Sequence, residues 1–326
     1  MQATGKVGLF GAAGAAGQSI GAALGAAGRD YRVVGRSREA LQRTFGHDPH
    51  AEIVIWNPDD PTSIRAAAAG LQTVVYLVGV PYDQFAQHPP LMEKTLAGVM
   101  AAGVERFILI GTVYPYGRAR GSNPIHEDHP REPHTFKGRM RLAQENLVLA
   151  AHGQNGFKTL VLRLPDFYGP GVERSLLHDI FVGAAAARRA QVLGPIDMPH
   201  EFIYLPDVGP VVERLTRTPD AYGRWWHLAG AGTITPREVA REAYALAGRE
   251  PKLMVAGKGM LRVLGLFNPL MRELVEMNYL MTEPLVLDDS ALAALIGPLR
   301  KTSYREGIRR CFEAARDEVS ERVSSR

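Results

Sequence analysis

The sequence predicts an α/β protein: a doubly wound parallel sheet with a smaller α/β lobe toward the C-terminus. Over the first half of the chain, short apolar runs alternate with Ala- and Leu-rich helical segments. This alternation is typical of a parallel sheet with helices on both faces, and near-continuous apolar runs fit strands buried on both sides. After about residue 165, clusters of proline and glycine interrupt the rhythm. We therefore expect a first domain over residues 1–165 and a smaller lobe over 166–326, interleaved with late strands of the first domain.

The elements are expected in the following order. Strands of the first domain are predicted at Val7–Phe10, Tyr31–Val34, Glu52–Trp56, Thr73–Val78, Arg106–Ile110 and Thr159–Leu162. Helices between them are predicted at Gln18–Ala27, Ser63–Ala69, Leu91–Ala102 and Met140–Ala151. In the second part, short strands are predicted at Val192–Leu193, Phe202–Leu205 and Trp225–Leu228, and helices at Ser175–Arg189, Pro236–Ala247, Met260–Glu276 and Tyr304–Glu318. Thr235, Pro236 and Glu238 form a helix start, with a capping threonine, a proline at the first position and an acid in the first turn.

The composition excludes several classes of protein. A chain of 326 residues can bury a core without covalent cross-links, and the lone cysteine, Cys311, excludes a disulfide scaffold and a cysteine-based zinc cluster. The N-terminus has no apolar signal core, and no run approaches the ~20 apolar residues that span a bilayer. We therefore expect a soluble, cytoplasmic protein with no membrane span. The net charge of +4 comes from basic residues spread along the chain, which argues against nucleic-acid binding.

The sharpest motif is the glycine-rich run Gly11–Gly17, which follows the first strand directly and opens the first helix. Gly11 permits a tight turn, Gly14 lets the backbone approach a pyrophosphate, and Gly17 permits close packing of helix on strand. Ala15 and Ala16 complete the loop, and the free N–H groups of the helix start face the phosphate oxygens. The flanking strand and helix distinguish this motif from a chance pattern in an Ala- and Gly-rich helix. The first domain is therefore predicted to be a dinucleotide-binding Rossmann domain.

The end of the second strand indicates which dinucleotide to expect. An acidic residue at this point usually accepts a hydrogen bond from the ribose 2′-hydroxyl of NAD. This chain has Arg36, Ser37 and Arg38 instead. Arginine cannot accept that hydrogen bond but pairs well with a 2′-phosphate. We predict NADP (NADPH), with Arg36 as the main contact and Ser37 and Arg38 as helpers; the alternative is that both arginines are solvated turn residues.

Three further positions complete the predicted cofactor site. Asn57 follows the third strand and is expected to reach the adenine edge, while Asp60 and Pro61 cap and begin the next helix. Val78 and Leu164 stand at the carboxyl ends of two further strands, where ligands of open α/β sheets bind. We expect both to lie against the cofactor.

Several segments resemble those of a known enzyme family. These are the glycine triplet, Val104–Thr112 with Tyr116 and Gly117, Leu162–Gly171, Glu201–Val208 and Tyr304–Ile308. They are similar to segments of the extended branch of the short-chain dehydrogenase/reductase superfamily, the epimerase/dehydratase type, and the resemblance covers nearly the whole chain. It implies the Rossmann fold. It also implies catalysis by a Ser or Thr that orients the substrate and a helical Tyr-x-x-x-Lys pair, in which Tyr transfers a proton and Lys lowers its pKa and holds the ribose.

The catalytic helix departs from that pattern. Thr112 occupies the Ser/Thr position, but when the helix is aligned on Leu142 and Glu145 the other two positions differ. Lys137 stands in place of the Tyr and Arg141 in place of the Lys. Residues four apart share one face of a helix, so Arg141 is expected to contact the ribose and supply charge, although it cannot donate a proton. Lys137 can act as an acid/base if burial and the charge of Arg141 lower its pKa; a solvated helix start is the alternative.

Other groups are candidates for the proton. Tyr114 and Tyr116 follow the fifth strand at its carboxyl end, and Asp166 and Tyr168 follow a later strand on the same side of the sheet. Packing explains most such residues without a catalytic role. Of the four, we retain Tyr114 as a catalytic candidate beside Thr112, Lys137 and Arg141.

Metal and substrate signals are weaker. The run His126–His134 contains histidines and carboxylates at a spacing that can hold a metal, but a solvated loop is more common and we expect no metal site. His200 stands where nucleotide-sugar enzymes of this branch often carry an Arg that holds the diphosphate. The segments 170–199 and Leu261–Met281 are mostly apolar. A mainly apolar substrate is therefore favoured slightly over a nucleotide sugar.

The first hypothesis is an NADP-dependent oxidoreductase of the atypical, extended short-chain type. It would transfer hydride to or from a small, mainly apolar carbonyl, alcohol or activated alkene, with a non-standard proton donor. The second hypothesis is a catalytically silent NADP-binding sensor or scaffold protein, which loss of the Tyr would permit. The third is a nucleotide-sugar epimerase or dehydratase. The expected partners are a small-molecule substrate and, as an option, a second copy of the chain in a homodimer.

Overall fold

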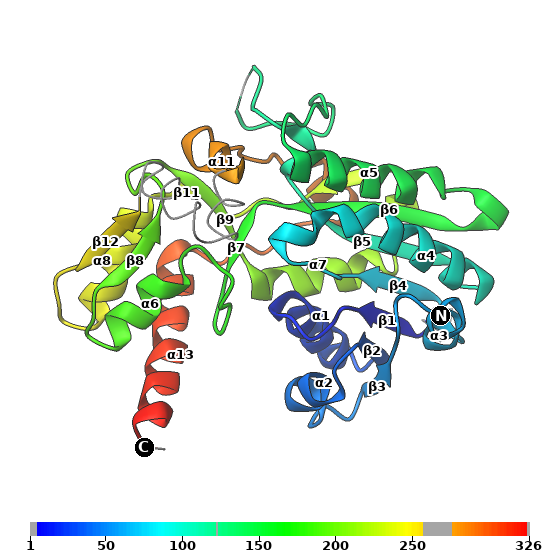
Figure 1. Ribbon diagram of the computed structural model, residues 1–326, viewed down its shortest axis with the longest axis horizontal. Helices are drawn as coiled ribbons and strands as arrows, with labels where there is room; N and C mark the ends of the chain where they lie inside the picture. The colour runs from blue at the N-terminus through cyan, green and yellow to red at the C-terminus, as the bar shows by residue number, and fades with distance from the viewer. Residues whose placement is uncertain (1–4, 122, 257–275, 325–326) are drawn as a thin grey trace.

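The computed structural model describes residues 5–121, 123–256 and 276–324. Its centre is a seven-stranded, all-parallel sheet in the order β10-β6-β5-β4-β1-β2-β3 (Figure 1). The strands are β1 (Val7–Phe10), β2 (Tyr31–Gly35), β3 (Ala51–Ile55), β4 (Thr73–Tyr76), β5 (Arg106–Thr112), β6 (Lys158–Leu164) and β10 (Trp225–His227). The chain order reverses between β1 and β4, and this reversal opens a crevice at the carboxyl ends of the strands. The predicted doubly wound parallel sheet is confirmed.

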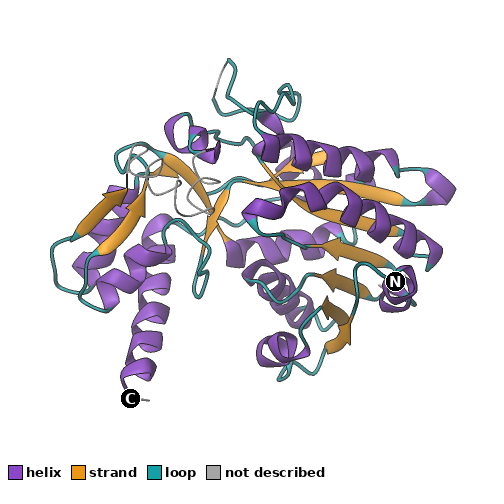
Figure 2. Ribbon diagram, viewed as in Figure 1, coloured by secondary structure: helices purple, strands orange, loops and turns teal. Residues whose placement is uncertain are grey.

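Each face of this sheet has its own core, because successive strand residues point to opposite sides. Leu9 and Val33 pack on one face, and their neighbours Phe10 and Val34 pack on the other. The first face is covered by α1 (Ala15–Ala26), α2 (Arg38–Phe45), α7 (Val208–Leu215) and α12 (Ser290–Ile296). The second is covered by α3 (Pro61–Ala68), α4 (His88–Ala101) and α5 (Phe136–Ala150) (Figure 2). Near-continuous apolar strands arise because both faces are buried.

The smaller lobe lies to the left of the sheet in Figure 1. Its helices α6 (His178–Ala185), α8 (Pro236–Leu246) and α13 (Tyr304–Ser324) pack around Phe181, Val239 and Phe312. A three-stranded sheet in the order β11-β9-β7 joins the lobe to the end of β6, and a two-stranded sheet pairs β12 with β8. Their bounds are β7 (Asp166–Tyr168), β8 (Ala190–Leu193), β9 (His200–Tyr204), β11 (Thr233–Ile234) and β12 (Leu253–Ala256). The short helix α11 (Tyr279–Thr282) and the 3-10 turns η1 (Tyr82–Gln87), η2 (Tyr114–Tyr116), η3 (Gln154–Gly156), η4 (Leu205–Asp207) and η5 (Pro219–Ala221) complete the elements.

Several elements differ from those predicted. Helix α2 was not expected, because only Leu41 and Phe45 of its eight residues are buried and its apolar periodicity is short. Strands β7 and β12 and helices α7 and α12 were also not expected, and the helix predicted over Ser175–Arg189 is the shorter α6. Residues beyond 165 contribute β10 and α7 to the central sheet and its helical cover. The helix predicted at Met260–Glu276 lies, except for Glu276, outside the described residues.

None of the helices in the described ranges combines the length and the apolarity needed to cross a membrane.

Candidate active site

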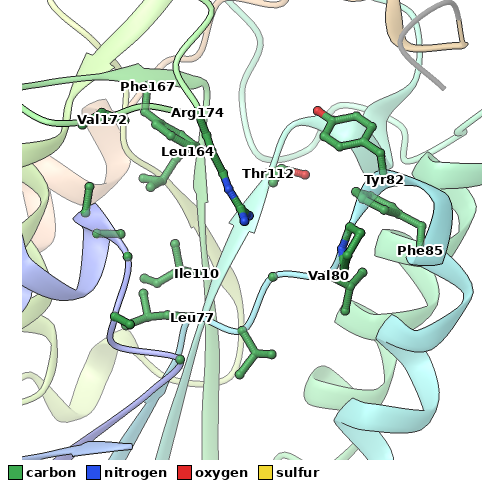
Figure 3. A pocket seen from close by; sticks show the side chains of 18 of the residues that line it. Leu77, Val80, Tyr82, Phe85, Ile110, Thr112, Leu164, Phe167, Val172 and Arg174 are labelled. Atoms are coloured by element: carbon green, nitrogen blue, oxygen red, sulfur yellow. The ribbon is translucent and has the colours of Figure 1, made fainter. Parts of the chain in front are cut away.

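A cleft of about 2000 Å³ crosses the carboxyl ends of β1, β2, β4, β5 and β6. One end, here called the glycine end, is formed by the loop Gly11–Ala16 and the residues that follow β2. The other, here called the tyrosine end, is formed by the loop after β4, the turn after β5, the segment 171–176 and residues of the α11 segment. Figure 3 shows side chains that enter the cleft from several of these elements. The cleft therefore lies where the sheet topology places a ligand.

Two glycines of the loop have no room for a side chain, and a third faces open space. Gly11 has a φ of +86°, and a Cβ there would lie 2.8 Å from the backbone nitrogen of Val78. A Cβ at Gly17 would lie 2.1 Å from the carbonyl oxygen of Ala12, so only glycine lets α1 pack this closely on the loop. A Cβ at Gly14, the N-cap of α1, would meet nothing within 4 Å, because this residue faces the open cleft. The unpaired N–H groups of the first turn of α1 are thus open to an anion, and the loop fits a dinucleotide pyrophosphate.

Positive charge gathers at the glycine end, where β2 finishes. Arg36 lines the cleft directly after β2, and Arg43 lines it from α2. Neither arginine has a hydrogen bond or an ion pair with a protein group among the described residues. Ser37 also lines the cleft, and its hydroxyl caps α2 by accepting a hydrogen bond of 3.2 Å from the Ala40 amide. Arg38 begins α2, is exposed, and lies outside the lining of the cleft.

The remaining predicted cofactor residues divide into two groups. Ala15, Ala16, Val78 and Leu164 line the cleft. Asn57 does not, because its side chain is used in the turn before α3, where its Oδ1 accepts from the amide of Asp59 at 3.0 Å. In the same turn, the Asp60 carboxylate caps α3 by accepting from the Thr62 amide at 2.9 Å, as the sequence predicted.

Three hydroxyl groups meet at the tyrosine end. Tyr82 comes from η1 and Tyr114 from η2, and their hydroxyl oxygens are 2.9 Å apart. Thr112 ends β5, and its Oγ1 accepts a hydrogen bond of 3.3 Å from the Tyr114 amide, which leaves the threonine O–H free to donate. All three residues line the cleft, and Figure 3 shows the Tyr82 hydroxyl pointing into it. Burial raises the pKa of both phenols, so both are protonated at neutral pH.

Lys137 is the second residue of α5 and is fully buried. Its Nζ lies 2.6 Å from Oε2 of Glu276, and its backbone N–H donates to Oε1 of the same carboxylate at 3.2 Å. The Nζ also lies 5.8 Å from the ring centroids of both Tyr82 and Phe85. Those two rings line the cleft and Lys137 does not. Lys137 therefore ties α5 to the segment that leads into α11, behind the aromatic wall of the site.

Arg141 lies one helical turn further along α5 and lines the cleft. Its Nη1 donates to Oε1 of Gln144 at 2.8 Å, and its guanidinium carbon is 5.6 Å from the Phe85 ring centroid. Burial and then the charge of Arg141 lower the pKa of the neighbouring His88 to about 2, so this imidazole is neutral. A permanent positive charge thus stands beside the three hydroxyl groups.

The rest of the tyrosine end combines apolar walls with two charged groups. Asp166 of β7 lines the cleft, and its Oδ2 lies 2.7 Å from Nε2 of His200. Arg174 enters from the segment 171–176 without a hydrogen bond or ion pair among the described residues, and Figure 3 shows it reaching toward Thr112. The apolar lining comes from Val80, Phe85, Phe167, Leu176, Met277, Leu280 and Met281.

Other sequence candidates have structural partners away from the cleft. The Tyr116 hydroxyl lies 2.5 Å from Nε2 of His227, and Tyr168 packs against neighbouring tyrosine rings; neither lines the cleft. In the loop before α5, His129 accepts from the Arg120 amide and Glu127 from the His227 amide. Over the described ranges, no group of three His, Cys, Asp or Glu residues is arranged to hold a metal.

The comparisons with known proteins agree with this arrangement. The model of the NAD dependent epimerase/dehydratase family matches residues 7–225. The chain belongs to this family. No curated protein sequence matches the chain significantly.

Solved structures of the same fold cover almost the whole chain. DesIV, a dTDP-glucose 4,6-dehydratase from Streptomyces venezuelae solved with NAD, is 17% identical with a TM-score of 0.78, over 97% of this chain and 98% of that chain. UDP-glucuronic acid 4-epimerase from Bacillus cereus, solved with NAD, is 15% identical with a TM-score of 0.76, over 96% and 99%. RMD from Pseudomonas aeruginosa, solved with NADPH, is 17% identical with a TM-score of 0.75, over 96% and 99%. The predicted resemblance to extended short-chain dehydrogenases/reductases is confirmed, and with it a site for a nicotinamide dinucleotide.

Four residues in or near the cleft were not predicted from the sequence to belong to the site. Arg43 lies three residues after Ala40 on one face of α2, and the helical spacing would have found it had α2 been predicted. Tyr82 and Arg174 lie in loops whose course depends on tertiary packing. Glu276 is 139 residues from its partner Lys137, and no spacing rule connects the two.

Proposed function

We propose that the protein is an NADP(H)-dependent oxidoreductase. The observation that carries the choice of cofactor is the pair of arginines at the glycine end, Arg36 and Arg43, which have no protein partner in the described ranges and face the cleft where β2 ends. A 2′-phosphate at that point would accept charge-assisted hydrogen bonds from both guanidinium groups, whereas the 2′-hydroxyl of NAD would meet no carboxylate. Ser37 would add a hydroxyl donor.

The test is the relative affinity for NADPH and NADH, measured by quenching of tryptophan fluorescence. Wild type is expected to bind NADPH about 100-fold more tightly, and Arg36→Met with Arg43→Met to bring the two affinities within about threefold of each other, because two charge-assisted contacts are lost. Arg38→Met is the matched control, since Arg38 is an exposed arginine of the same helix outside the cleft. Equal affinities in the wild type would refute the NADP assignment and leave NAD.

At the other end of the cleft, the proposed reaction is hydride transfer to or from a carbonyl, alcohol or activated alkene with a mainly apolar body. Phe85, Phe167 and Leu280 supply apolar surface, and the Thr112 hydroxyl is free to bind the reacting oxygen. Arg141 would hold the ribose and provide positive charge beside the oxygen as negative charge develops there. The unpaired Arg174 suits substrates that also carry a carboxylate or phosphate.

A second candidate is transient oxidation of a nucleotide sugar by an epimerase or dehydratase, because the similar solved structures include enzymes named for UDP- and dTDP-sugars. Incubation with UDP-glucose, UDP-glucuronic acid and dTDP-glucose, followed by chromatography of the products, decides between the two. Conversion of any of these sugars supports the second candidate, and NADPH oxidation by a panel of ketones, aldehydes and enones supports the first. Tight NADPH binding with neither activity would indicate the silent sensor or scaffold.

A further inference from the structure

The reduction of a carbonyl requires a proton as well as a hydride. The residue at the position of the family's catalytic Tyr does not reach the cleft to supply that proton. Lys137 stands at that position, but its Nζ is buried against Glu276 and lies outside the lining of the cleft. Arg141 lines the cleft but cannot donate a proton at any working pH. A different group at the tyrosine end must therefore donate the proton.

Tyr82 has the geometry of a proton donor. Its hydroxyl points into the cleft, and Thr112, the residue expected to bind the reacting oxygen, lines the same cleft (Figure 3). The Tyr114 hydroxyl lies 2.9 Å away and can donate a hydrogen bond to the oxygen of Tyr82 when that oxygen becomes negative. Because Tyr82 is only partly buried, it also has a path to solvent for regaining its proton.

Two cations stand around Tyr82. The Nζ of Lys137 is 5.8 Å from the Tyr82 ring centroid, and the Glu276 carboxylate accepts a hydrogen bond from it at 2.6 Å. Burial, the largest influence, raises the pKa of Tyr82, and the charge of Asp166 adds to this. The hydrogen bond from Tyr114 and the charges of Arg141 and Lys137 oppose the rise. Burial, and then the neighbours Tyr82 and Asp166, also raise the pKa of Tyr114, so both phenols hold their protons at neutral pH.

We infer that Tyr82, from the loop after β4, is the proton donor of the proposed reduction, and that Tyr114 is a positioning residue that hydrogen-bonds to it. The inference rests on the proposed oxidoreductase function. The bound dinucleotide supplies the hydride, which forms the new C–H bond at the carbonyl carbon. As the C=O π electrons move to oxygen, that oxygen takes the phenolic proton of Tyr82 and an alcohol results. The phenolate accepts a hydrogen bond from Tyr114, is balanced by Lys137 and Arg141, and regains a proton from water. In total, one carbonyl is reduced, one NADPH is oxidised and one solvent proton is consumed.

The experiment compares Tyr82→Phe and Tyr114→Phe with a control, Tyr222→Phe, which removes a phenol hydroxyl outside the cleft. Three quantities are measured: the Kd for NADPH, the rate of NADPH oxidation with cinnamaldehyde and 9,10-phenanthrenequinone as carbonyl probes, and the Kd of cinnamaldehyde for the protein loaded with NADP⁺. In the last measurement no turnover occurs, so the readout is independent of activity.

Tyr82→Phe is expected to lower kcat about 100-fold, the range for loss of a general acid, while the NADPH Kd stays within about twofold. It should also weaken cinnamaldehyde binding about tenfold, because a hydrogen bond to the carbonyl oxygen is lost. Tyr114→Phe should lower kcat about tenfold and shift the pH profile, because the Tyr82 phenolate loses its hydrogen-bond donor. Tyr222→Phe should behave as the wild type.

Two results overturn the inference and are distinguishable from each other. If the wild type reduces the probes and Tyr82→Phe keeps its rate and cinnamaldehyde affinity within about twofold, the donor is another group and the proposed function stands. If the wild type neither binds nor reduces any carbonyl probe, the proposed function fails and the inference fails with it.

Discussion

The two ends of the cleft are built by different physical means. The glycine end depends on the backbone: a tight turn at Gly11, a close approach at Gly17 and the first N–H groups of α1 create the site. The tyrosine end depends on side chains from segments far apart in the chain, such as Tyr82, Tyr114 and the residues of the α11 segment. The glycine end is therefore sensitive to the addition of a single carbon atom, and the tyrosine end to the loss of single interactions between distant elements.

The largest expected effect tests the contact that holds the tyrosine end together. Lys137→Met leaves the Glu276 carboxylate, whose side chain is 25% exposed, without the ammonium group 2.6 Å away. Breaking a fully buried ion pair typically costs about 3–5 kcal/mol, and because Glu276 keeps partial access to water, urea unfolding should show a loss of about 3 kcal/mol. Lys94→Met is the control, because its ion pair with Asp59 is exposed and such pairs contribute about 0–1 kcal/mol.

The charge-reversed double variant, Lys137→Glu with Glu276→Lys, tests whether the stability lost in Lys137→Met comes from the ion pair itself. If the ion pair itself matters, the double variant should recover part of the stability that Lys137→Met loses, because opposite charges again face each other. A double variant as unstable as the sum of its single variants would contradict the role of the pair. A loss below about 1 kcal/mol in Lys137→Met would show that the pair behaves as a surface contact.

The next effect concerns the glycine end. Gly17→Ala places a Cβ 2.1 Å from the carbonyl oxygen of Ala12, so α1 must move away from the loop. We expect NADPH affinity to fall about 100-fold and stability by about 1–3 kcal/mol, since overpacked sites relax by shifting the backbone. Gly25→Ala in the same helix is the matched control, because its Cβ would come no closer than 3.3 Å to another group, the side chain of Asp48. Unchanged NADPH binding by Gly17→Ala would show that the position of α1 does not control the site.

The sequence predicted the glycine end well for a physical reason. The tight turn at Gly11 and the close packing at Gly17 each require glycine, so these two positions of the motif report the geometry directly. Apolar runs likewise identified the strands of the central sheet, because most of them are buried on both faces; the edge strand β3 is only partly buried. Arg36 and Ser37 line the cleft because they follow β2 without an intervening loop.

The sequence predicted less of the tyrosine end. Tyr82 follows β4 by six residues, through a proline turn and a 3-10 helix whose course no periodicity describes. The ion pair between Lys137 and Glu276 joins α5 to a segment 139 residues further along the chain, and no sequence spacing predicts it. Asn57 failed to reach the cleft because local turn hydrogen bonds use its side chain first. Local chemistry is readable from sequence, whereas contacts between distant loops depend on the completed fold.

The smallest expected effect is a pH dependence located beside the tyrosine end. Glu201 on β9 is buried, and its carboxylate accepts hydrogen bonds from the amides of Gly230 and Leu287, which tie two loops to the lobe. Burial raises the pKa of Glu201 to about 7, from 4.5 in an unperturbed carboxyl group. Folding therefore favours the protonated form. The stability it contributes is fully present below pH 4.5 and is lost as the pH rises through about 7.

Urea unfolding between pH 5 and pH 8 tests this sign. Over that range the wild type should lose about 2 kcal/mol relative to Glu201→Gln, which cannot ionise, after each protein is referenced to its own value at pH 5. The comparison uses slopes because the amide of Gln cannot accept both backbone hydrogen bonds and shifts stability by a constant amount. Parallel curves for the two proteins would show that the Glu201 carboxylate is already ionised at pH 5. The two loops would then be held by a charged rather than a neutral group, and their contact with β9 would be insensitive to pH over this range.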